Sequence, residues 1–229
     1  MLWSLNNRVC RCVMKPLVEL LVLDAHGVIF NAPFASLLHK IATETGQTHV
    51  AIRHRWNIMR ADFWSGRLDE AKFWSELTGS TSDDGDRWRN WLENATELGP
   101  AAPSLERWSR YVPVWLLSNH RSDWLLPRLA RFGLDRYLER ILVSDRLNTV
   151  KPEPASFVSL LTTQRPAKTI LFIDDSLPNV EAARRLGIMA MHAHENEAWI
   201  FTVDRMLGKQ SPRQWIDDEG KSFWGRPSE

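Results

Sequence analysis

The stretch that most restricts the fold of this chain is a short apolar run, Leu20 to Leu23, which leads directly into Asp24. Unbroken apolar runs of this length are typical of strands buried on both faces, as in a parallel sheet. Ligands of such sheets bind beyond the carboxyl ends of the strands, so Asp24 is predicted to stand at the mouth of a site. Gly27 follows three residues later, where it permits a sharp turn and brings backbone amides close to a bound anion.

Further apolar runs alternate with helical patterns along the chain. Strands are predicted at residues 112–117, 140–143, 169–173 and 188–191. Helices are predicted at residues 105–111, 124–132, 157–163 and 178–186. Pro127 is expected in the first turn of its helix and Ser176 at the cap of the last one. The alternation predicts an α/β fold, a Rossmann-like parallel sheet between layers of helices.

Residues 33–98 interrupt this alternation with four helical segments and no convincing strand. The segments are predicted at residues 33–45, 49–63, 68–77 and 86–98. Five of the 12 tryptophans fall in this region, where most of them are expected to pack the helices together. The domain prediction is an α/β core (15–32 and 99–205), a helical cap inserted after the first strand (33–98), an N-terminal extension (1–14) and a C-terminal tail (206–229). Met1 and Met14 are both candidate translation starts.

Composition narrows the classes of partner. The formal net charge of +1 over 229 residues favours no nucleic-acid partner, because it offers no basic excess. No apolar run approaches the roughly 18 residues that span a membrane. The two cysteines, Cys10 and Cys12, are too close in sequence for a good disulfide, so a reducing cytoplasm is expected. Nothing in the sequence specifies an oligomeric state.

Polar residues follow the predicted strands at the points where the strands end. Asp24, Ser118-Asn119 and Asp174-Asp175 stand at such ends, and Lys151 lies in a loop. In a parallel sheet these groups converge on one edge, where three carboxylates need a compensating charge. Oxygen ligands alone favour Mg²⁺. A carboxylate nucleophile, a magnesium ion, a lysine and a hydroxyl donor together indicate phosphoryl-transfer chemistry.

The same groups form four motifs in a fixed order: Asp24-Ala-His-Gly-Val28, Ser118-Asn119, Lys151-Pro152, and Asp174-Asp175-Ser176 with Asn179. This arrangement resembles the haloacid dehalogenase (HAD) superfamily, in the branch with a small helical cap after the first motif. The resemblance covers roughly residues 15–205. It implies a phosphatase acting on a small phosphorylated metabolite, with a cap that closes over the substrate and excludes water.

The resemblance also implies individual roles. Asp24 would be the nucleophile that forms an aspartyl-phosphate. The metal would be held by the carboxylates of Asp24 and Asp175 and the backbone carbonyl of His26, with Asp174 acting through water. The phosphoryl group would be bound by Gly27, Ser118, Asn119 and Lys151.

His26 departs from the family pattern, because HAD phosphatases usually carry a second Asp there as the general acid/base. Histidine can perform both proton transfers, and its ordinary pKa of about 6.5 suits neutral pH, although a nearby magnesium ion disfavours the imidazolium. Three interpretations follow: a phosphatase with His26 as acid/base, a HAD enzyme with dehalogenase-like chemistry, or a catalytically weak binding or scaffold protein. The first is favoured, because dehalogenases of the superfamily do not keep the Asp174-Asp175 pair.

Overall fold

The structure is a computed structural model that describes residues 17–80, 85–194, 196–208, 214–216 and 222–224. The predicted N-terminal extension, with Cys10 and Cys12, lies outside the described residues, as does most of the predicted C-terminal tail. Within the described ranges, no helix combines the length and the apolar character that a membrane crossing needs.

Five parallel strands form the central sheet, in the order β3-β2-β1-β4-β5. They are β1 (Leu20–Leu23), β2 (Val114–Ser118), β3 (Arg140–Val143), β4 (Ile170–Asp174) and β5 (Met189–His192). In the central strand β1, Leu21 pairs with Val114 on one side and with Leu171 on the other. Every residue of β1, β2 and β4 is buried, which is why unbroken apolar runs encode them. The predicted α/β fold and parallel sheet are confirmed.

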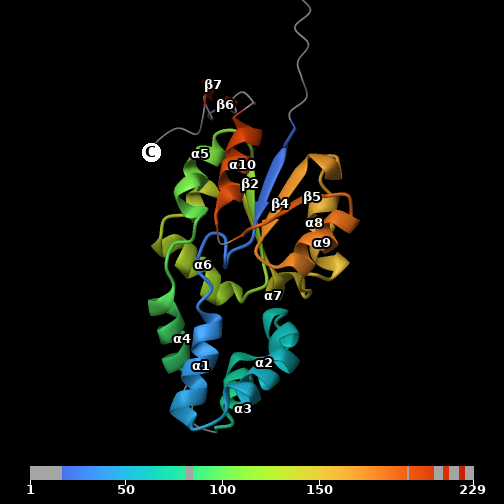
Figure 1. Cartoon of the computed structure of the whole chain (residues 1–229). Helices are drawn as coiled ribbons and strands as arrows, with labels where there is room; N and C mark the ends of the chain where they lie inside the picture. Colours follow the sequence, from blue (N-terminus) through green and yellow to red (C-terminus); the bar gives the residue numbers. More distant parts are fainter. Residues whose placement is uncertain (1–16, 81–84, 195, 209–213, 217–221, 225–229) are drawn as a thin grey trace, which may run out of the picture.

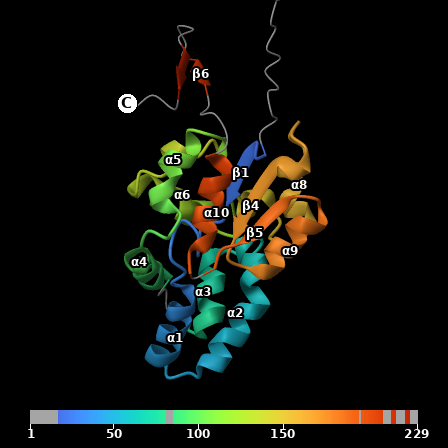
Figure 2. The same cartoon turned by 45° about the horizontal axis from the view of Figure 1, so that its top comes forward.

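Helices cover both faces of this sheet (Figures 1 and 2). One face is packed by α5 (Leu105–Ser109), α6 (Ser122–Arg131) and α10 (Ala198–Leu207). The other is packed by α8 (Val158–Leu161) and α9 (Leu177–Arg185). Successive residues of β1 serve the two faces in turn, with Leu21 in the first core and Leu20 in the second.

Shorter elements complete the described chain. They are α7 (Ser144–Leu147), the 3₁₀ turns at residues 102–104, 135–137, 154–157 and 167–169, and an antiparallel pair, β6 (Gln214–Ile216) and β7 (Ser222–Trp224). The predicted helix at 157–163 is therefore a 3₁₀ turn followed by the single turn of α8. The sequence prediction lacks α10, although Trp199, Val203 and Leu207 recur every four residues and are buried.

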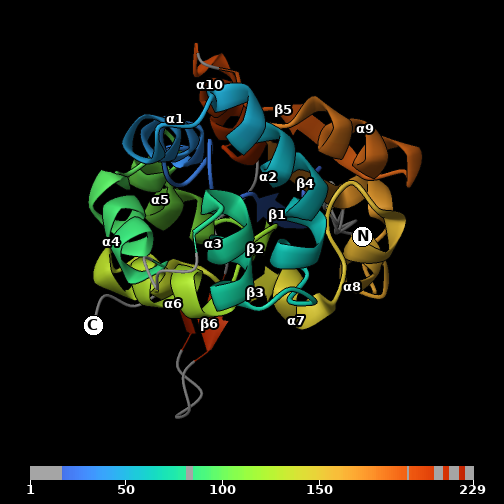
Figure 3. The ribbon, with the colours of Figure 1, turned by 90° about the horizontal axis from the view of Figure 1, so that it is seen from below.

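Among the described residues, four helices are inserted after β1 and before the core helix α5, as predicted. They are α1 (Phe34–Thr45), α2 (His49–Trp64), α3 (Glu70–Thr78) and α4 (Gly85–Ala95), the last ending three residues before the predicted position. They bury a core of their own, in which the rings of Phe63 and Phe73 stack with centroids 3.7 Å apart. This helical segment lies over the carboxyl ends of the strands, as the view from below shows (Figure 3).

The prediction for Pro127 is wrong. α6 begins at Ser122, so the proline is its sixth residue and lies beyond the first turn. Proline has no backbone N–H, and the helix therefore lacks the bond that position 127 would make to the carbonyl of Asp123. That carbonyl instead accepts a hydrogen bond from Arg89 Nη2 of α4, at 2.9 Å. The carbonyl that the proline leaves free of a helical bond thus connects the core to the inserted helices.

Candidate active site

Lys151 is the centre of the polar groups at the carboxyl edge of the sheet. Its ammonium is buried and lies 2.6 Å from Asp174 Oδ2 and 2.9 Å from Asp24 Oδ1, and it donates to the carbonyl of Leu117 at 2.7 Å. Burial alone lowers the pKa of a lysine, but the carboxylates of Asp174 and Asp24 outweigh it and raise the pKa of Lys151. The ammonium is therefore charged at neutral pH and joins the ends of three neighbouring strands.

Asn119 positions the backbone of Lys151. Its side-chain amide donates to the carbonyl of Lys151 at 2.8 Å, and its side-chain oxygen accepts from the N–H of Lys151 at 2.8 Å. Both halves of the amide are thus committed to the lysine loop. Ser118 is buried beside it as the last residue of β2. The side chain of Asn119 therefore supports Lys151, which leaves its backbone for the predicted phosphoryl contact.

Both carboxylate oxygens of Asp174 accept hydrogen bonds from neighbouring residues. Its Oδ1 accepts from the backbone N–H of Ser176 at 2.8 Å and from Asn179 Nδ2 at 3.0 Å, while its Oδ2 accepts from Lys151. Ser176 stands at the N-cap of α9 as predicted, but its side chain makes no capping bond. With both oxygens committed, Asp174 fits the predicted indirect role at a metal.

Asp24, Asp174 and Asp175 each place a carboxylate oxygen within 4.8 Å of the other two. Burial, reinforced by the charges of Asp24 and Asp174, raises the pKa of Asp175 to about 7. Asp24 Oδ1 is buried and makes no hydrogen bond of good geometry, although Lys151 lies beside it. Three crowded carboxylates with a single ammonium beside two of them fit a divalent cation that prefers oxygen ligands.

Gly27 leaves room for this cluster. Its φ is +73°, and a Cβ at this position would lie 2.3 Å from Asp175 Oδ2. A side chain there would therefore displace the carboxylate as well as strain the backbone. The glycine, predicted to ease a sharp turn, also lets the first motif approach Asp175.

Binding of Mg²⁺ is expected to weaken as the pH falls. With a pKa of about 7, the Asp175 carboxyl is almost fully deprotonated at pH 8 and almost fully protonated at pH 5.5. Magnesium must displace that proton, so its dissociation constant is expected to rise about 30-fold between the two pH values. The shift of the melting temperature on titration with MgCl₂ measures this change. Asp175→Asn should bind weakly at both pH values, and an equal pH dependence in that variant would contradict the assignment.

His26 is surrounded in a way that the sequence does not predict. Arg128 Nη1 lies 3.0 Å from its Nε2, and because arginine only donates, Nε2 is the acceptor and Nδ1 carries the proton of the neutral ring. Burial, reinforced by the charges of Arg128 and Lys151, lowers the pKa of His26 to about 3. Arg128 is itself buried and forms a two-pronged ion pair with Glu93 of α4. His26 is thus neutral at physiological pH and is linked through Arg128 to the inserted helices.

A cavity of about 160 Å³ begins at His26 and Asn119 and extends between the inserted helices and the core. The ring of His26 stacks on His120, and His120 stacks on Trp64, with centroids 4.9 and 5.0 Å apart. The remaining walls are largely aromatic and aliphatic: Pro33, Phe34, Trp56, Leu92 and Trp124. Trp56 and Trp64 thus pack against the core of the inserted helices, as predicted, and also form part of the cavity wall.

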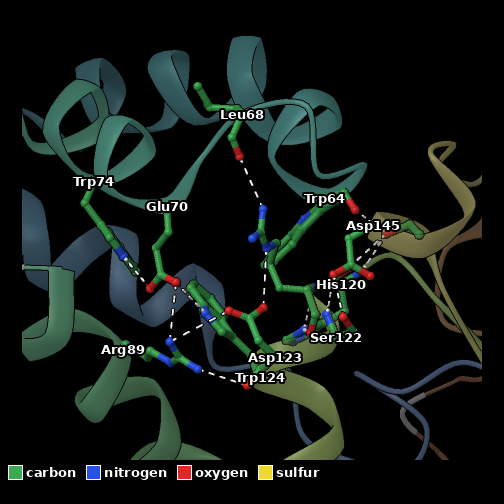
Figure 4. A network of polar contacts seen from close by, with 12 residues as sticks. Trp64, Leu68, Glu70, Trp74, Arg89, His120, Ser122, Asp123, Trp124 and Asp145 are labelled. Atoms are coloured by element: carbon green, nitrogen blue, oxygen red, sulfur yellow. Dashed lines mark hydrogen bonds and ion pairs between the residues drawn. The ribbon is translucent and has the colours of Figure 1, made fainter.

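Polar contacts hold the inserted helices on the core around this cavity (Figure 4). Glu70 of α3 accepts from Trp124 Nε1 of α6 at 3.0 Å and from Trp74 Nε1 of its own helix at 3.1 Å. Arg121, just before α6, donates to the carbonyl of Leu68 at 3.3 Å. Ser144 Oγ bonds to the carbonyl of Trp64. These contacts join residues 64–74 of the inserted helices to Arg121, Trp124 and Ser144 of the core.

The structure brings all eight predicted site residues to one edge of the sheet and adds residues that the sequence analysis did not select. Arg128, Glu93 and Trp64 had no local signal of function, because an arginine on an amphipathic helix is usually solvated. His120 had one, since it follows Ser118-Asn119 directly.

Comparisons with known proteins agree with this architecture. Residues 19–187 match the family described as haloacid dehalogenase-like hydrolase. A predicted HAD-like family hydrolase from Porphyromonas gingivalis superposes with a TM-score of 0.68 at 22% identity, covering 85% of this chain and all of the other. A mutant HAD family enzyme from Bacteroides thetaiotaomicron, in complex with magnesium and inorganic phosphate, has a TM-score of 0.64 at 22% identity over 80% of this chain and 99% of its own. The chain belongs to the haloacid dehalogenase-like hydrolases.

Curated relatives align with a smaller part of this chain. A probable phosphoglycolate phosphatase from Pseudomonas savastanoi is 27% identical over 115 residues, 50% of this chain and 69% of that protein. A phosphoglycolate phosphatase from Yersinia pestis is 27% identical over 57% of this chain and 56% of its own length. These alignments cover about half of this chain.

Proposed function

We propose that this hydrolase is a magnesium-dependent phosphatase that cleaves a small phosphate monoester through an aspartyl-phosphate on Asp24. The observation that carries the proposal is the meeting of three carboxylates, from Asp24, Asp174 and Asp175, with the buried ammonium of Lys151 at the carboxyl edge of the sheet. The ammonium can bind an anionic substrate, and the carboxylates can bind a cation that accompanies it. The magnesium and phosphate bound by the Bacteroides enzyme of the same fold support it.

Each residue then has a defined task. The Asp24 carboxylate attacks phosphorus as the ester P–O bond breaks and the alcohol leaves, and Lys151 and Ser118 donate to the phosphoryl oxygens together with backbone amides near Gly27 and Asn119. The metal would be held by the Asp24 and Asp175 carboxylates and the His26 backbone carbonyl, with Asp174 acting through water. Bound there, magnesium supplies positive charge that offsets the charge on the transferring group. The helical insertion excludes water from the cavity during the transfer.

His26 keeps its proposed place as the acid/base, and its surroundings support the base half of that role better than the acid half. A neutral imidazole can take a proton from the water that attacks the aspartyl-phosphate, once Nε2 is released from Arg128. Protonation of the leaving group would need an imidazolium, which a pKa of about 3 makes scarce at neutral pH. Turnover should therefore favour esters whose leaving group departs without a proton.

A binding or scaffold protein is the second candidate, and one observation favours it: Arg128 occupies the basic nitrogen of the only residue proposed for proton transfer. In that case the site would bind phosphate and magnesium without releasing product. A cytoplasmic location is part of either proposal.

Phosphate release from a panel of monoesters tests the proposal. p-Nitrophenyl phosphate, phosphoglycolate and alkyl phosphates are incubated with the whole chain in Mg²⁺ or in excess chelator. Release is expected only with Mg²⁺ and to return when Mg²⁺ is restored, because the Asp24–Asp175 cluster needs the cation. Undiminished activity in chelator would exclude the magnesium mechanism, and halide release from a 2-haloacid would replace it by dehalogenase-like chemistry. No release on any ester, with magnesium bound, would favour the binding protein.

A further inference from the structure

We propose that the cavity between the inserted helices and the core receives the leaving group of the substrate, and that this group is a single uncharged ring. This substrate class rests on the proposed phosphatase function. The cavity begins at His26 and Asn119, which follow the nucleophile Asp24 and the phosphoryl-binding Ser118 within two residues. A phosphoryl group held at Asp24 and Ser118 therefore directs the rest of the ester into this space.

The size of the cavity limits the group to one ring. Its volume is about 160 Å³. An apolar protein cavity of about 150 Å³ holds one benzene molecule. A nucleoside or a second ring would exceed this volume, whereas a two-carbon acid would leave much of the space empty.

The walls favour a flat apolar group. Phe34 and Trp56 lie with ring centroids 4.3 Å apart, and Trp64 meets Trp56 edge-on at 5.5 Å, so three rings form one corner. The stacked imidazoles of His26 and His120 continue the wall toward Asp24. Aromatic rings bind one another in such offset and edge-on arrangements, which reward a ring more than a flexible chain.

Several polar atoms in the walls already have partners within the protein. Both halves of the Asn119 amide bond to Lys151, and Thr96 Oγ1 donates to the carbonyl of Leu92 at 2.7 Å. The indole N–H of Trp124 donates to Glu70. A polar leaving group would lose its water without gaining these bonds, and that loss is unfavourable in an apolar cavity.

Neither sign of charge is accommodated. Arg128 is the one arginine or lysine among the described residues that line the cavity, and its guanidinium is paired with Glu93. A carboxylate on the ligand would meet a guanidinium whose charge Glu93 already offsets and whose Nη1 already contacts His26. An ammonium would meet Arg128 without a carboxylate in the lining to bind it. The cavity therefore disfavours the carboxylate of phosphoglycolate, although relatives of this chain bear the name of that substrate.

Phosphonates test this inference without turnover, because their carbon–phosphorus bond is not hydrolysed. Methylphosphonate, benzylphosphonate, phosphonoacetate and 2-aminoethylphosphonate share the phosphonate head and differ in the group that enters the cavity. Calorimetric titration of the whole chain in Mg²⁺ is expected to show benzylphosphonate binding at least about tenfold more tightly than methylphosphonate, from burial of the ring. The two charged ligands should bind no more tightly than methylphosphonate.

Two tryptophan variants locate the effect. Trp56→Ala is expected to remove most of the benzyl advantage and to leave methylphosphonate binding unchanged, which also reports an intact core. Trp91→Ala is the matched control, because Trp91 is a half-buried tryptophan of α4 that does not line the cavity. It should keep the full benzyl advantage.

The outcomes separate this inference from the proposed function. The ring-site inference would be overturned if the parent chain bound benzylphosphonate and methylphosphonate with equal affinity, or bound none of the four ligands. Tighter binding of either charged ligand would also overturn it. Preferential binding of benzylphosphonate with no phosphate release from benzyl phosphate or any other ester would instead refute the phosphatase and retain the ring site. Release of phosphate without the benzyl preference would retain the phosphatase and refute the ring site.

Discussion

Replacing Asp24 by asparagine is expected to lower phosphate release by about 10⁴-fold or more and to prevent any phosphate from being bound covalently. Asparagine has the shape of aspartate but no anionic oxygen to attack phosphorus. Its amide also cannot hold a cation beside Asp175 as a carboxylate does. Acid quenching during turnover of p-nitrophenyl phosphate, followed by mass spectrometry of the intact chain, measures the phosphoenzyme directly.

His26→Ala is the informative partner of that variant. Its loss on alkyl phosphates is expected to be about 10²-fold, the lower end for a general base, because the pKa of His26 is low. With p-nitrophenyl phosphate, formation of the aspartyl-phosphate needs no acid, so its hydrolysis becomes limiting and phosphate should accumulate on Asp24. His120→Ala, which removes the ring stacked on His26, serves as control and should affect both kinds of ester alike. Full activity of His26→Ala on every ester would refute the role of His26, and a phosphoenzyme in Asp24→Asn would refute that of Asp24.

Lys151→Met is expected to lower the free energy of unfolding by about 3–5 kcal/mol at pH 7 and phosphate release by about 10²–10³-fold. Methionine has a similar length but no charge, so two buried carboxylates, Asp24 and Asp174, lose the ammonium between them. Urea unfolding at pH 7 measures the first effect. The second follows because no ammonium remains to bind the phosphoryl oxygens.

The pH dependence of this destabilisation has a definite sign. Without the ammonium, which holds the pKa of the Asp174 carboxyl down, that pKa in the folded state rises further above the unfolded value. Groups whose folded pKa is raised contribute stability at low pH that is lost as the pH rises through the folded pKa. The difference between Lys151→Met and the parent should therefore shrink as the pH is lowered from 7 to 5. The control, Lys72→Met, removes an exposed lysine 3.8 Å from Glu76 and should cost less than about 1 kcal/mol. Equal losses in the two variants would contradict the buried ion-pair network.

Local patterns determined most of the fold. The three inner strands, β1, β2 and β4, are short apolar runs, as a sheet covered on both faces requires. Gly46 and Gly79 cap the C-terminal ends of α1 and α3 in the left-handed conformation that favours glycine. The succession of strands and helices along the chain followed from the alternation of apolar runs and helical patterns. The predictions failed at two places. The predicted helix at 157–163 contains only the single turn of α8, and Pro127 lies inside α6 rather than in its first turn.

For the candidate site, the sequence predicted the positions of the residues but not their protonation states. Asp24, Ser118, Lys151 and the Asp174-Asp175 pair could be found from sequence, because the carboxyl ends of parallel strands must meet at one edge. The protonation states of Asp175 and His26 could not be found in this way. The pKa of Asp175 near 7 and that of His26 near 3 depend on burial and on charges that only the packed chain brings near.

Only the tertiary structure decided what surrounds the nucleophile. Arg128 contacts His26 across 102 positions of sequence, and Glu93 reaches the same arginine from an inserted helix. The aromatic cavity forms because α1, α2 and α6 place rings from distant segments against one another. Periodicity records that a side chain is buried, but its partner depends on how helices pack, and no local pattern of residues encodes that choice.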